Sequence, residues 1–307
     1  MDLHHALIRE LMPGPAPAAE ACAAVGVEEE QLNQLLTDWV AEGAELTEGP
    51  DGLRASLRRA WGPLTLSLRA GRPVEHHPSI GSTNARARAL AAKTPWGAPL
   101  PVVVADHQTE GRGRQGRRWE AEPGAGILMS VVLRPAVPPH EAPRCVLLWA
   151  AALAELLDLQ LKWPNDLVCP AGGKVGGLLA ELDAGIDAEG RPVVRSVVLG
   201  VGLNIEQPAD PTLATASSLR RLGRAPEDRA ALVGAMVRAI DAVDPHAPGG
   251  LDRWRARAHT LGRRVRVGEI EGIAEAIRED GALLIDGRPI LTGDVELVTG
   301  ERPDEPQ

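Results

Sequence analysis

A glycine-rich and arginine-rich segment runs from Gly111 to Trp119. It carries four arginines and no acidic residue, in a chain whose formal net charge is −9. Glycine lets a backbone lie against a ligand, and guanidinium groups match the oxygens of phosphates and carboxylates. The segment therefore predicts a flexible loop that closes over an anionic ligand, with a plain solvated basic loop as the alternative.

The letters Gly111 to Gly116 also match the GxGxxG pattern of dinucleotide-binding folds. That fold requires a helix that opens inside the motif and an acidic residue about 20 positions later. Residues 117–124 are typical of a loop, and the next apolar run, Ile127 to Leu133, is typical of a strand. The pattern favours a ligand loop over a dinucleotide fold.

A second compact set of polar residues runs from Lys162 to Asp166, with the sequence Lys-Trp-Pro-Asn-Asp. Proline restricts the residue before it to extended backbone, so the set is expected at a strand end that delivers polar groups to a pocket. Asn-Asp alone is typical of an ordinary turn. Lys174 follows between two glycine pairs and is expected to be a mobile cation. A further close-approach turn, Gly200 to Asn204, ends in an amide.

Together these segments supply arginines, lysines, amides and a carboxylate, with no recognisable Ser/His/Asp triad or nucleophilic cysteine. Such a set suits electrostatic stabilisation of an anionic transfer, as when a carboxylate attacks the α-phosphate of a nucleotide. Ser82-Thr83-Asn84, taken by itself, is typical of a helix N-cap.

The elements that must position these groups alternate through residues 69–255. Strands are expected at Val102–Ala105, Ile127–Leu133 and Val193–Val201, and helices at Thr83–Lys93, Arg144–Leu157 and Pro226–Val243. This alternation predicts a mixed α/β sheet domain. From Gly262 onward, short strands at 265–267, 272–278, 282–285 and 295–298 predict a small barrel.

Residues 1–60 predict three helices, the first carrying Leu3 to Leu11, followed by a hairpin, which is the outline of a winged helix-turn-helix. They carry eleven acidic and four basic side chains. The expected recognition helix, residues 28–42, has no Lys or Arg. Because DNA is a polyanion, we expect this region not to bind it tightly.

The composition is that of a globular chain of 307 residues, with 44% hydrophobic residues and no Phe or Tyr. The core must therefore consist of aliphatic side chains and some of the seven Trp residues. Three cysteines without a CxxC pair, no signal-peptide pattern and no long apolar run indicate a cytoplasmic protein. The net charge argues against general binding to nucleic acid or membrane surfaces.

With these motifs in hand, the chain resembles the biotin protein ligase family, in its bifunctional biotin operon repressor form. The resemblance rests on Ser82–Asn84, residues 106–117, Lys162–Asp166, Lys174–Gly177 and Gly200–Asn204. It implies an α+β protein with a class II synthetase-like mixed sheet, between an N-terminal winged helix-turn-helix and a C-terminal SH3-like barrel. The expected boundaries are 1–65, 69–258 and 261–300, with a tail at 301–307.

The resemblance also implies a two-step, ATP- and Mg²⁺-dependent reaction. Biotin and ATP give biotinyl-5′-adenylate, and biotin then passes to a lysine of a carrier domain on a biotin-dependent carboxylase. The implied catalytic residues are Lys174, Arg112 and Arg114. The implied biotin-binding residues are Ser82, Thr83, Asn84, Gln108, Gly111, Arg112, Gly113, Arg114, Lys174 and Gly202. The implied ATP and adenylate contacts are Arg114, Arg117, Trp119, Lys162, Asn165, Asp166 and Asn204, with Asp166 also as a metal ligand.

The chain departs from the family pattern at two places. Residues 127–130 lack the usual aromatic residue of the strand after the loop, and residues 120–123 replace the usual Ser-Pro after the loop tryptophan. Two other functions stay open. One is a lipoate-type ligase or acyltransferase on the same fold, and the other is a biotin-responsive repressor that binds DNA through residues 1–60. A homodimer is implied by resemblance alone.

Overall fold

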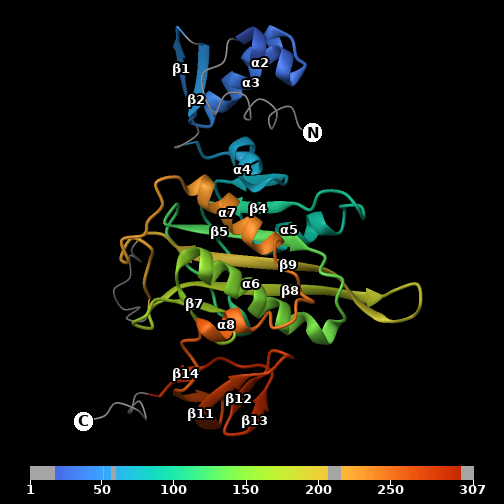
Figure 1. Ribbon diagram of the computed structural model, residues 1–307, viewed down its shortest axis with the longest axis vertical. Helices are drawn as coiled ribbons and strands as arrows, with labels where there is room; N and C mark the ends of the chain where they lie inside the picture. Colours follow the sequence, from blue (N-terminus) through green and yellow to red (C-terminus); the bar gives the residue numbers. More distant parts are fainter. Residues whose placement is uncertain (1–17, 51, 57–59, 207–215, 299–307) are drawn as a thin grey trace. The chain divides into compact units, whose positions relative to one another are not determined.

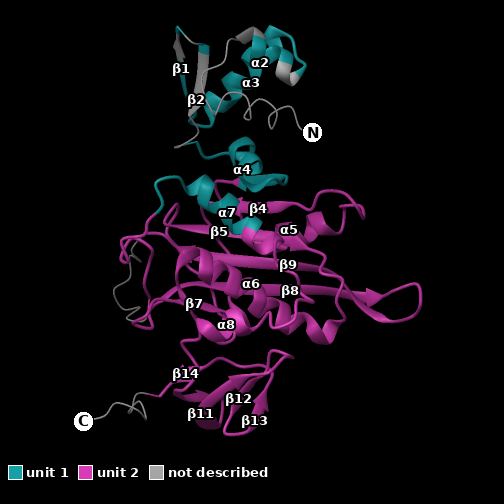
Figure 2. Cartoon of the chain, viewed as in Figure 1, with its two compact units in different colours: residues 1–76, 226–238 teal, residues 77–225, 239–307 magenta. Residues whose placement is uncertain are grey.

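The computed structural model describes residues 18–50, 52–56, 60–206 and 216–298 (Figure 1). The chain forms two compact units, coloured separately in Figure 2: residues 1–76 with 226–238, and residues 77–225 with 239–307. The predicted helix carrying Leu3 to Leu11 and the tail 301–307 lie outside the described residues.

In the first unit, the described residues before position 60 form two helices and a hairpin. The helices are α2 (Ala18–Val25) and α3 (Glu29–Ala41), and strands β1 (Glu45–Gly49) and β2 (Gly52–Ser56) pair antiparallel. Leu32, Leu36 and Trp39 repeat at helical spacing on α3 and are buried, whereas Val40 is half exposed. The helices and hairpin predicted between residues 18 and 56 are thus present.

The next helix of this unit, α4 (Pro63–Ala70), begins at a residue that cannot cap it with a side chain, Gly62. Glu42 provides the cap from a distance in sequence. Its carboxylate accepts hydrogen bonds from the backbone N–H groups of Leu64 and Thr65, at 2.9 and 2.8 Å. A negative group at a helix N-terminus satisfies free N–H donors and interacts favourably with the helix dipole. Gly62 leaves the space that the Glu42 side chain fills.

A seven-stranded mixed sheet supports the second unit. Its strand order is β3-β4-β5-β9-β8-β7-β6, and every ladder from β4 to β6 is antiparallel. The strands are β3 (Val74–His77), β4 (Val102–Ala105), β5 (Gly126–Leu133), β6 (Gln160–Lys162), β7 (Asp166–Val168), β8 (Lys174–Ile186) and β9 (Pro192–Asn204). β8 and β9 form the long hairpin that extends to the right in Figure 1.

Helix α5 (Thr83–Ala91) packs on β4, β5 and β9 through small side chains. Ala87 and Ala91 meet Val103, Val132 and Val198 in one buried cluster. Helix α6 (Ala142–Leu157) contacts β6, β7 and β8, and α8 (Asp252–Ala256) packs beside it. Because Phe and Tyr are absent, the largest fully buried side chains of the described residues are tryptophans, among them Trp163 and Trp254.

The C-terminal region forms a five-stranded antiparallel sheet of order β13-β12-β11-β10-β14. Its strands are β10 (Arg264–Val267), β11 (Ile270–Ile277), β12 (Leu283–Ile285), β13 (Arg288–Ile290) and β14 (Glu296–Leu297). Four of these were predicted from apolar runs between glycine turns. Strand β13 was missed, because only Ile290 of its three residues is apolar and of strand-favouring type.

The expectation for Lys174 was wrong. This residue is the first of the thirteen-residue strand β8 and does not lie on a mobile glycine loop. Residues 174–186 contain few β-branched side chains and several glycines, so propensity alone does not indicate a strand. Pairing with β7 on one side and β9 on the other fixes it instead. None of the described helices is both long and apolar enough to cross a membrane.

Candidate active site

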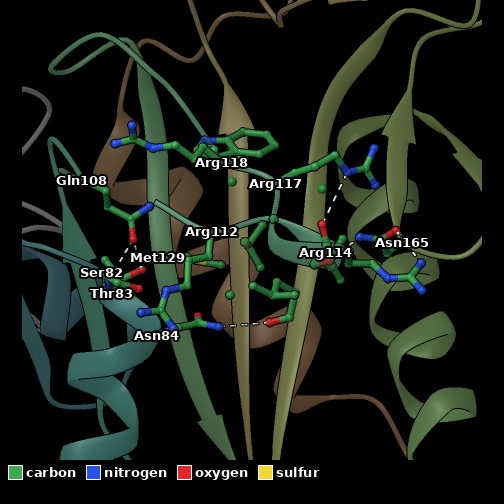
Figure 3. A pocket seen from close by; sticks show the side chains of 18 of the residues that line it. Ser82, Thr83, Asn84, Gln108, Arg112, Arg114, Arg117, Arg118, Met129 and Asn165 are labelled. Atoms are coloured by element: carbon green, nitrogen blue, oxygen red, sulfur yellow. Dashed lines mark hydrogen bonds between the residues drawn. The ribbon is translucent and has the colours of Figure 1, made fainter. Parts of the chain in front are cut away.

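A pocket in the second unit gathers side chains from segments that are far apart in the sequence (Figure 3). Its cavity volume is about 200 Å³, and its mouth is open to solvent. Of the predicted site residues, thirteen line it: Ser82, Thr83, Asn84, Gln108, Arg112, Gly113, Arg114, Arg117, Trp119, Asn165, Asp166, Lys174 and Gly202. These are residues of all five motifs on which the family resemblance rests.

The charge of this pocket is opposite to that of the chain. Four arginines of the loop and Lys174 line it, against a single carboxylate, Asp166. Concave surfaces lined by one sign of charge concentrate ligands of the other sign. The pocket is therefore suited to a ligand with several negative charges, such as a polyphosphate.

The arginine loop has a defined backbone. A bridge joins Arg112 to Arg118, and the N–H of Gly113 donates to the carbonyl of Arg117 at 2.8 Å. Between them lies a single 3₁₀ turn, Arg114–Gly116. No α-helix opens inside the motif, so the prediction of a loop in place of a dinucleotide-binding turn is confirmed, and its role in binding a ligand stays a prediction. At its base, a side chain on Gly111 would stand 2.3 Å from the carbonyl oxygen of Trp119.

Two guanidinium groups of this loop converge on one carboxylate from the C-terminal sheet region. Arg117 pairs with Asp294, and Arg114 Nη1 lies 3.4 Å from the same carboxylate. Arg114 also donates to the carbonyl of Gly293 at 3.1 Å and to Asn165 Oδ1 at 3.4 Å. Burial lowers the pKa of Arg114, and the Asp294 and Asp166 charges raise it in part. The geometry shows that Arg114 and Arg117 can bind one anion together.

Lys174 is held between a carboxylate and an aromatic ring. Its Nζ lies 2.7 Å from Asp166 Oδ1 and 5.6 Å from the centre of the Trp119 ring. Trp119 in turn packs against Gly202, where an added Cβ would stand 2.5 Å from the indole. The glycine on β9 thus makes room for the ring, and the ring and Asp166 together fix the lysine.

The opposite end of the pocket is uncharged and polar. Ser82 caps helix α5, and Thr83 donates from its N–H and its hydroxyl to Gln108 Oε1, at 2.8 and 3.0 Å. The N-cap interpretation of Ser82 is confirmed. Because Gln108 Oε1 already accepts these two hydrogen bonds, the amide N–H₂ is the part of Gln108 left to meet a ligand (Figure 3).

Three predicted site residues do not line the pocket: Gly111, Lys162 and Asn204. The amide of Asn204 donates to the carbonyl of Ser217 at 3.1 Å. Trp163, which lies between Lys162 and Asn165 in the sequence, is buried and does not line the pocket, and its ring N–H donates to the carbonyl of Gly281 at 3.1 Å.

The pocket also has lining residues that sequence reasoning missed as site residues. They are Arg118, Met129, Gly177, Leu178, Leu179, Gly200 and Val201. Arg118, Gly177, Gly200 and Val201 lie inside segments that the sequence singled out, although they were not predicted to be site residues. Met129, Leu178 and Leu179 lie on strands without a local motif, and the pairing of those strands brings them to the pocket.

Metal ligands are sparse in this pocket. Throughout residues 18–298, as far as the structure describes them, no group of three or more His, Cys, Asp or Glu side chains could hold a metal ion. Asp166 is the one carboxylate of the pocket lining and already pairs with Lys174.

Comparison with known proteins gives a consistent result. The sequence model of the Biotin/lipoate A/B protein ligase family matches residues 78–204. A biotin–[acetyl-CoA-carboxylase] ligase of Mycobacterium tuberculosis is 37% identical over 244 residues, covering 70% of this chain and 85% of that protein. The bifunctional ligase/repressor BirA of Bacillus subtilis is 31% identical over 251 residues, 74% of each chain.

Among solved structures, the biotin protein ligase of Aquifex aeolicus in complex with biotin and ATP superposes with a TM-score of 0.56 at 26% identity. The match covers 73% of this chain and 98% of that one. The motifs, the pocket that they build and the extent of these matches lead to one assignment: this chain belongs to the biotin protein ligase family.

Proposed function

We propose that this protein is an ATP-dependent biotin protein ligase. It forms biotinyl-5′-adenylate and then transfers biotin to a lysine of a biotin carboxyl carrier domain. The carrier belongs to a biotin-dependent carboxylase, of which acetyl-CoA carboxylase is the type named for its relative. The observation that carries the proposal is one pocket with a polar, uncharged end at Thr83 and Gln108 and a strongly cationic end at the arginine loop and Lys174.

The two ends fit the two substrates. The uncharged end suits the cyclic urea of biotin, which offers N–H donors beside a carbonyl acceptor, with Ser82, Thr83, Asn84 and Gln108 around it. The cationic end suits the triphosphate of ATP. The biotin chain would run through the pocket between these two ends, so that its carboxylate approaches the α-phosphate.

In the first step, a biotin carboxylate oxygen attacks the α-phosphorus, and the bond to the bridging oxygen of pyrophosphate breaks. Negative charge builds on the α-phosphate and on the leaving group. Lys174, Arg112 and Arg114 offset this charge from fixed positions, which is worth about 100-fold or more in rate for each donor of this kind. Arg117, Trp119, Asn165 and Asp166 complete the nucleotide side.

In the second step, the neutral amine of the carrier lysine attacks the acyl carbon of the adenylate. The bond to the phosphate oxygen breaks, AMP leaves with the electron pair, and the amine loses one proton to form the amide. The same cations that favoured the adenylate hold the leaving AMP. Mg²⁺ would enter with ATP and neutralise phosphate charge. Asp166 is the one carboxylate of the pocket lining and would contribute an oxygen to Mg²⁺ in place of its pair with Lys174, since Mg²⁺ often takes one or two carboxylates beside phosphates.

The finer architecture is part of the same proposal. We assign a class II synthetase-like catalytic domain to residues 69–258, an SH3-like domain to 261–300 and a winged helix to 1–65. The assignment of a winged helix is supported by the two helices and the hairpin that the structure describes between residues 18 and 56. Helix α3 carries acidic residues and no Lys or Arg, so the proposal does not include tight DNA binding. The proposal does include a homodimer.

The experiment must distinguish biotin from lipoate, because the matching family model covers ligases for both. The protein is incubated with ATP and Mg²⁺ together with either biotin or lipoate, and nucleotide products are identified by mass spectrometry. We expect adenylate and pyrophosphate to form in the incubation with biotin and not in the incubation with lipoate. Adduct formation with lipoate in place of biotin would support the lipoate-type ligase instead.

A further inference from the structure

A chain of buried polar groups continues from the pocket into the sheet behind Thr83. Its centre is Ser130 on β5, which is fully buried. Ser130 Oγ lies 2.8 Å from Thr83 Oγ1 and 2.6 Å from Asn84 Oδ1. Ser130 does not line the pocket, so its contact with a ligand would run through Thr83.

Asn84 links this serine to strand β8. Its Nδ2 donates to Glu181 Oε2 at 2.9 Å and to the carbonyl of Leu179 at 3.3 Å. The other oxygen of Glu181 pairs with Arg88 on helix α5. Carboxylate and carbonyl oxygens accept hydrogen bonds and cannot donate them, so the N–H₂ of Asn84 must face β8 and its Oδ1 must face Ser130.

Glycine at position 200 keeps Asn84 in this orientation. The amide lies directly over Gly200 of β9, where an added Cβ would stand 2.3 Å from Asn84 Oδ1. The strand register places Gly200 opposite Ser130 on one side and opposite Leu179 on the other. The amide therefore lies across three adjacent strands, in space that only a glycine leaves.

Each hydroxyl group among these buried polar residues has a single hydrogen atom to donate. Thr83 has one hydroxyl hydrogen, which it donates to Gln108 Oε1, and its oxygen faces the Ser130 hydroxyl as an acceptor. Ser130 also has one, and Asn84 Oδ1 at 2.6 Å is its shortest contact. Both hydrogens are thus used inside the protein. The Thr83 hydroxyl can therefore act toward a ligand only as a hydrogen-bond acceptor, and the Gln108 amide can act as a donor through its N–H₂.

From this arrangement we propose that Ser130, Asn84 and Glu181 are positioning residues of the biotin site. They hold the Thr83 hydroxyl in place, so that its oxygen accepts a hydrogen bond from a urea N–H while Gln108 donates to an acceptor of the same ring. The inference rests on the proposed function and refines it, since Asn84 acts here through Ser130 and Thr83. None of the three residues takes part in the chemistry at phosphorus.

The test uses the whole chain with Ser130→Ala, and Ser130→Cys as a second variant that keeps a side-chain group at this position but donates only weakly. Both should raise the KM for biotin by about tenfold, the usual worth of one buried hydrogen bond. The KM for ATP should stay within about twofold, because the cationic end is unchanged. Ser196→Ala, a buried serine of the same sheet outside the pocket, is the matched control and should leave both constants unchanged.

A biotin derivative with a methyl group on a urea nitrogen provides a second readout. The wild type should prefer biotin strongly over this derivative, and Ser130→Ala should reduce that preference about tenfold, because only biotin loses a bond. A role in stability alone would leave the preference unchanged and would therefore overturn the inference. Equal rises in both KM values would overturn it as well. If the wild type uses no biotin at all, the proposed function itself fails.

Discussion

Replacing Lys174 by alanine is the perturbation that isolates the chemistry of the pocket most clearly. The Lys174 ammonium is the only non-arginine cation of the pocket lining, held 2.7 Å from Asp166 and above the Trp119 ring. It starts strand β8, so its position is fixed by the sheet. A fixed cation beside developing phosphate charge needs no reorganisation during the reaction, which is the source of its effect on rate.

The expected magnitude follows from what the side chain does in each state. Loss of one preorganised donor costs about 100- to 1000-fold in rate. Stability should change little, because the ion pair is partly exposed (38% and 21% for the two side chains), and such pairs are worth about 1 kcal/mol or less. For a chain of this size, that corresponds to roughly 4 °C or less in Tm.

The assay is biotin-dependent exchange of labelled pyrophosphate into ATP, which reports the first step without a carrier domain. Thermal unfolding is recorded for the same samples. Lys93→Ala is the control, because Lys93 is an exposed lysine that follows helix α5 and lies outside the pocket. A Lys174→Ala variant that keeps its fold and exchanges within about threefold of the wild type would refute the reasoning.

Three further predictions concern the rest of the molecule. Gly202→Ala should strongly reduce adenylate formation, because the new Cβ meets the Trp119 indole at 2.5 Å. Gly185→Ala on β8 should be tolerated, because its Cβ meets the flexible Arg195 side chain. Pyrophosphate exchange assays on both variants test this. Burial raises the pKa of the Cys145 thiol to about 11. At pH 8 this thiol should therefore resist alkylation in the native protein and react only after denaturation, which mass spectrometry can follow. Modification of the native protein at the rate of a free thiol would contradict the buried placement. The full-length protein should give no sequence-specific mobility shift of DNA at physiological salt, since helix α3 has no basic side chain, and a sub-micromolar shift that depends on biotinyl-adenylate would refute this.

The sequence was most informative where function depends on contiguous residues. The arginine loop, the run from Lys162 to Asp166 and the cap at Ser82 each contain their own signal, since glycine, proline and N-cap residues constrain the backbone locally. Thirteen of the predicted site residues accordingly line one pocket. The same holds for helix α6, whose apolar run reads as buried without knowledge of its neighbours.

Features that depend on the register between distant strands were not predictable. Strand β8 lacks the β-branched residues that mark most strands and is defined by its two neighbours. Ser130 and Glu181 are 51 positions apart in a sequence that gives no sign of their link through Asn84. The direction of the Trp163 ring is likewise decided by a carbonyl in the C-terminal region, at Gly281.

The central claim is that this chain joins biotin to a carrier lysine through an adenylate made in the described pocket. The most direct measurement is the intact mass of a purified biotin carboxyl carrier domain after incubation with the protein, ATP, Mg²⁺ and biotin. A carrier domain with arginine in place of its acceptor lysine is the control. We predict the addition of one biotinyl group to the carrier, which requires ATP and is absent from the control. An unmodified carrier domain, or one that gains a lipoyl group when lipoate is supplied instead, would contradict the account.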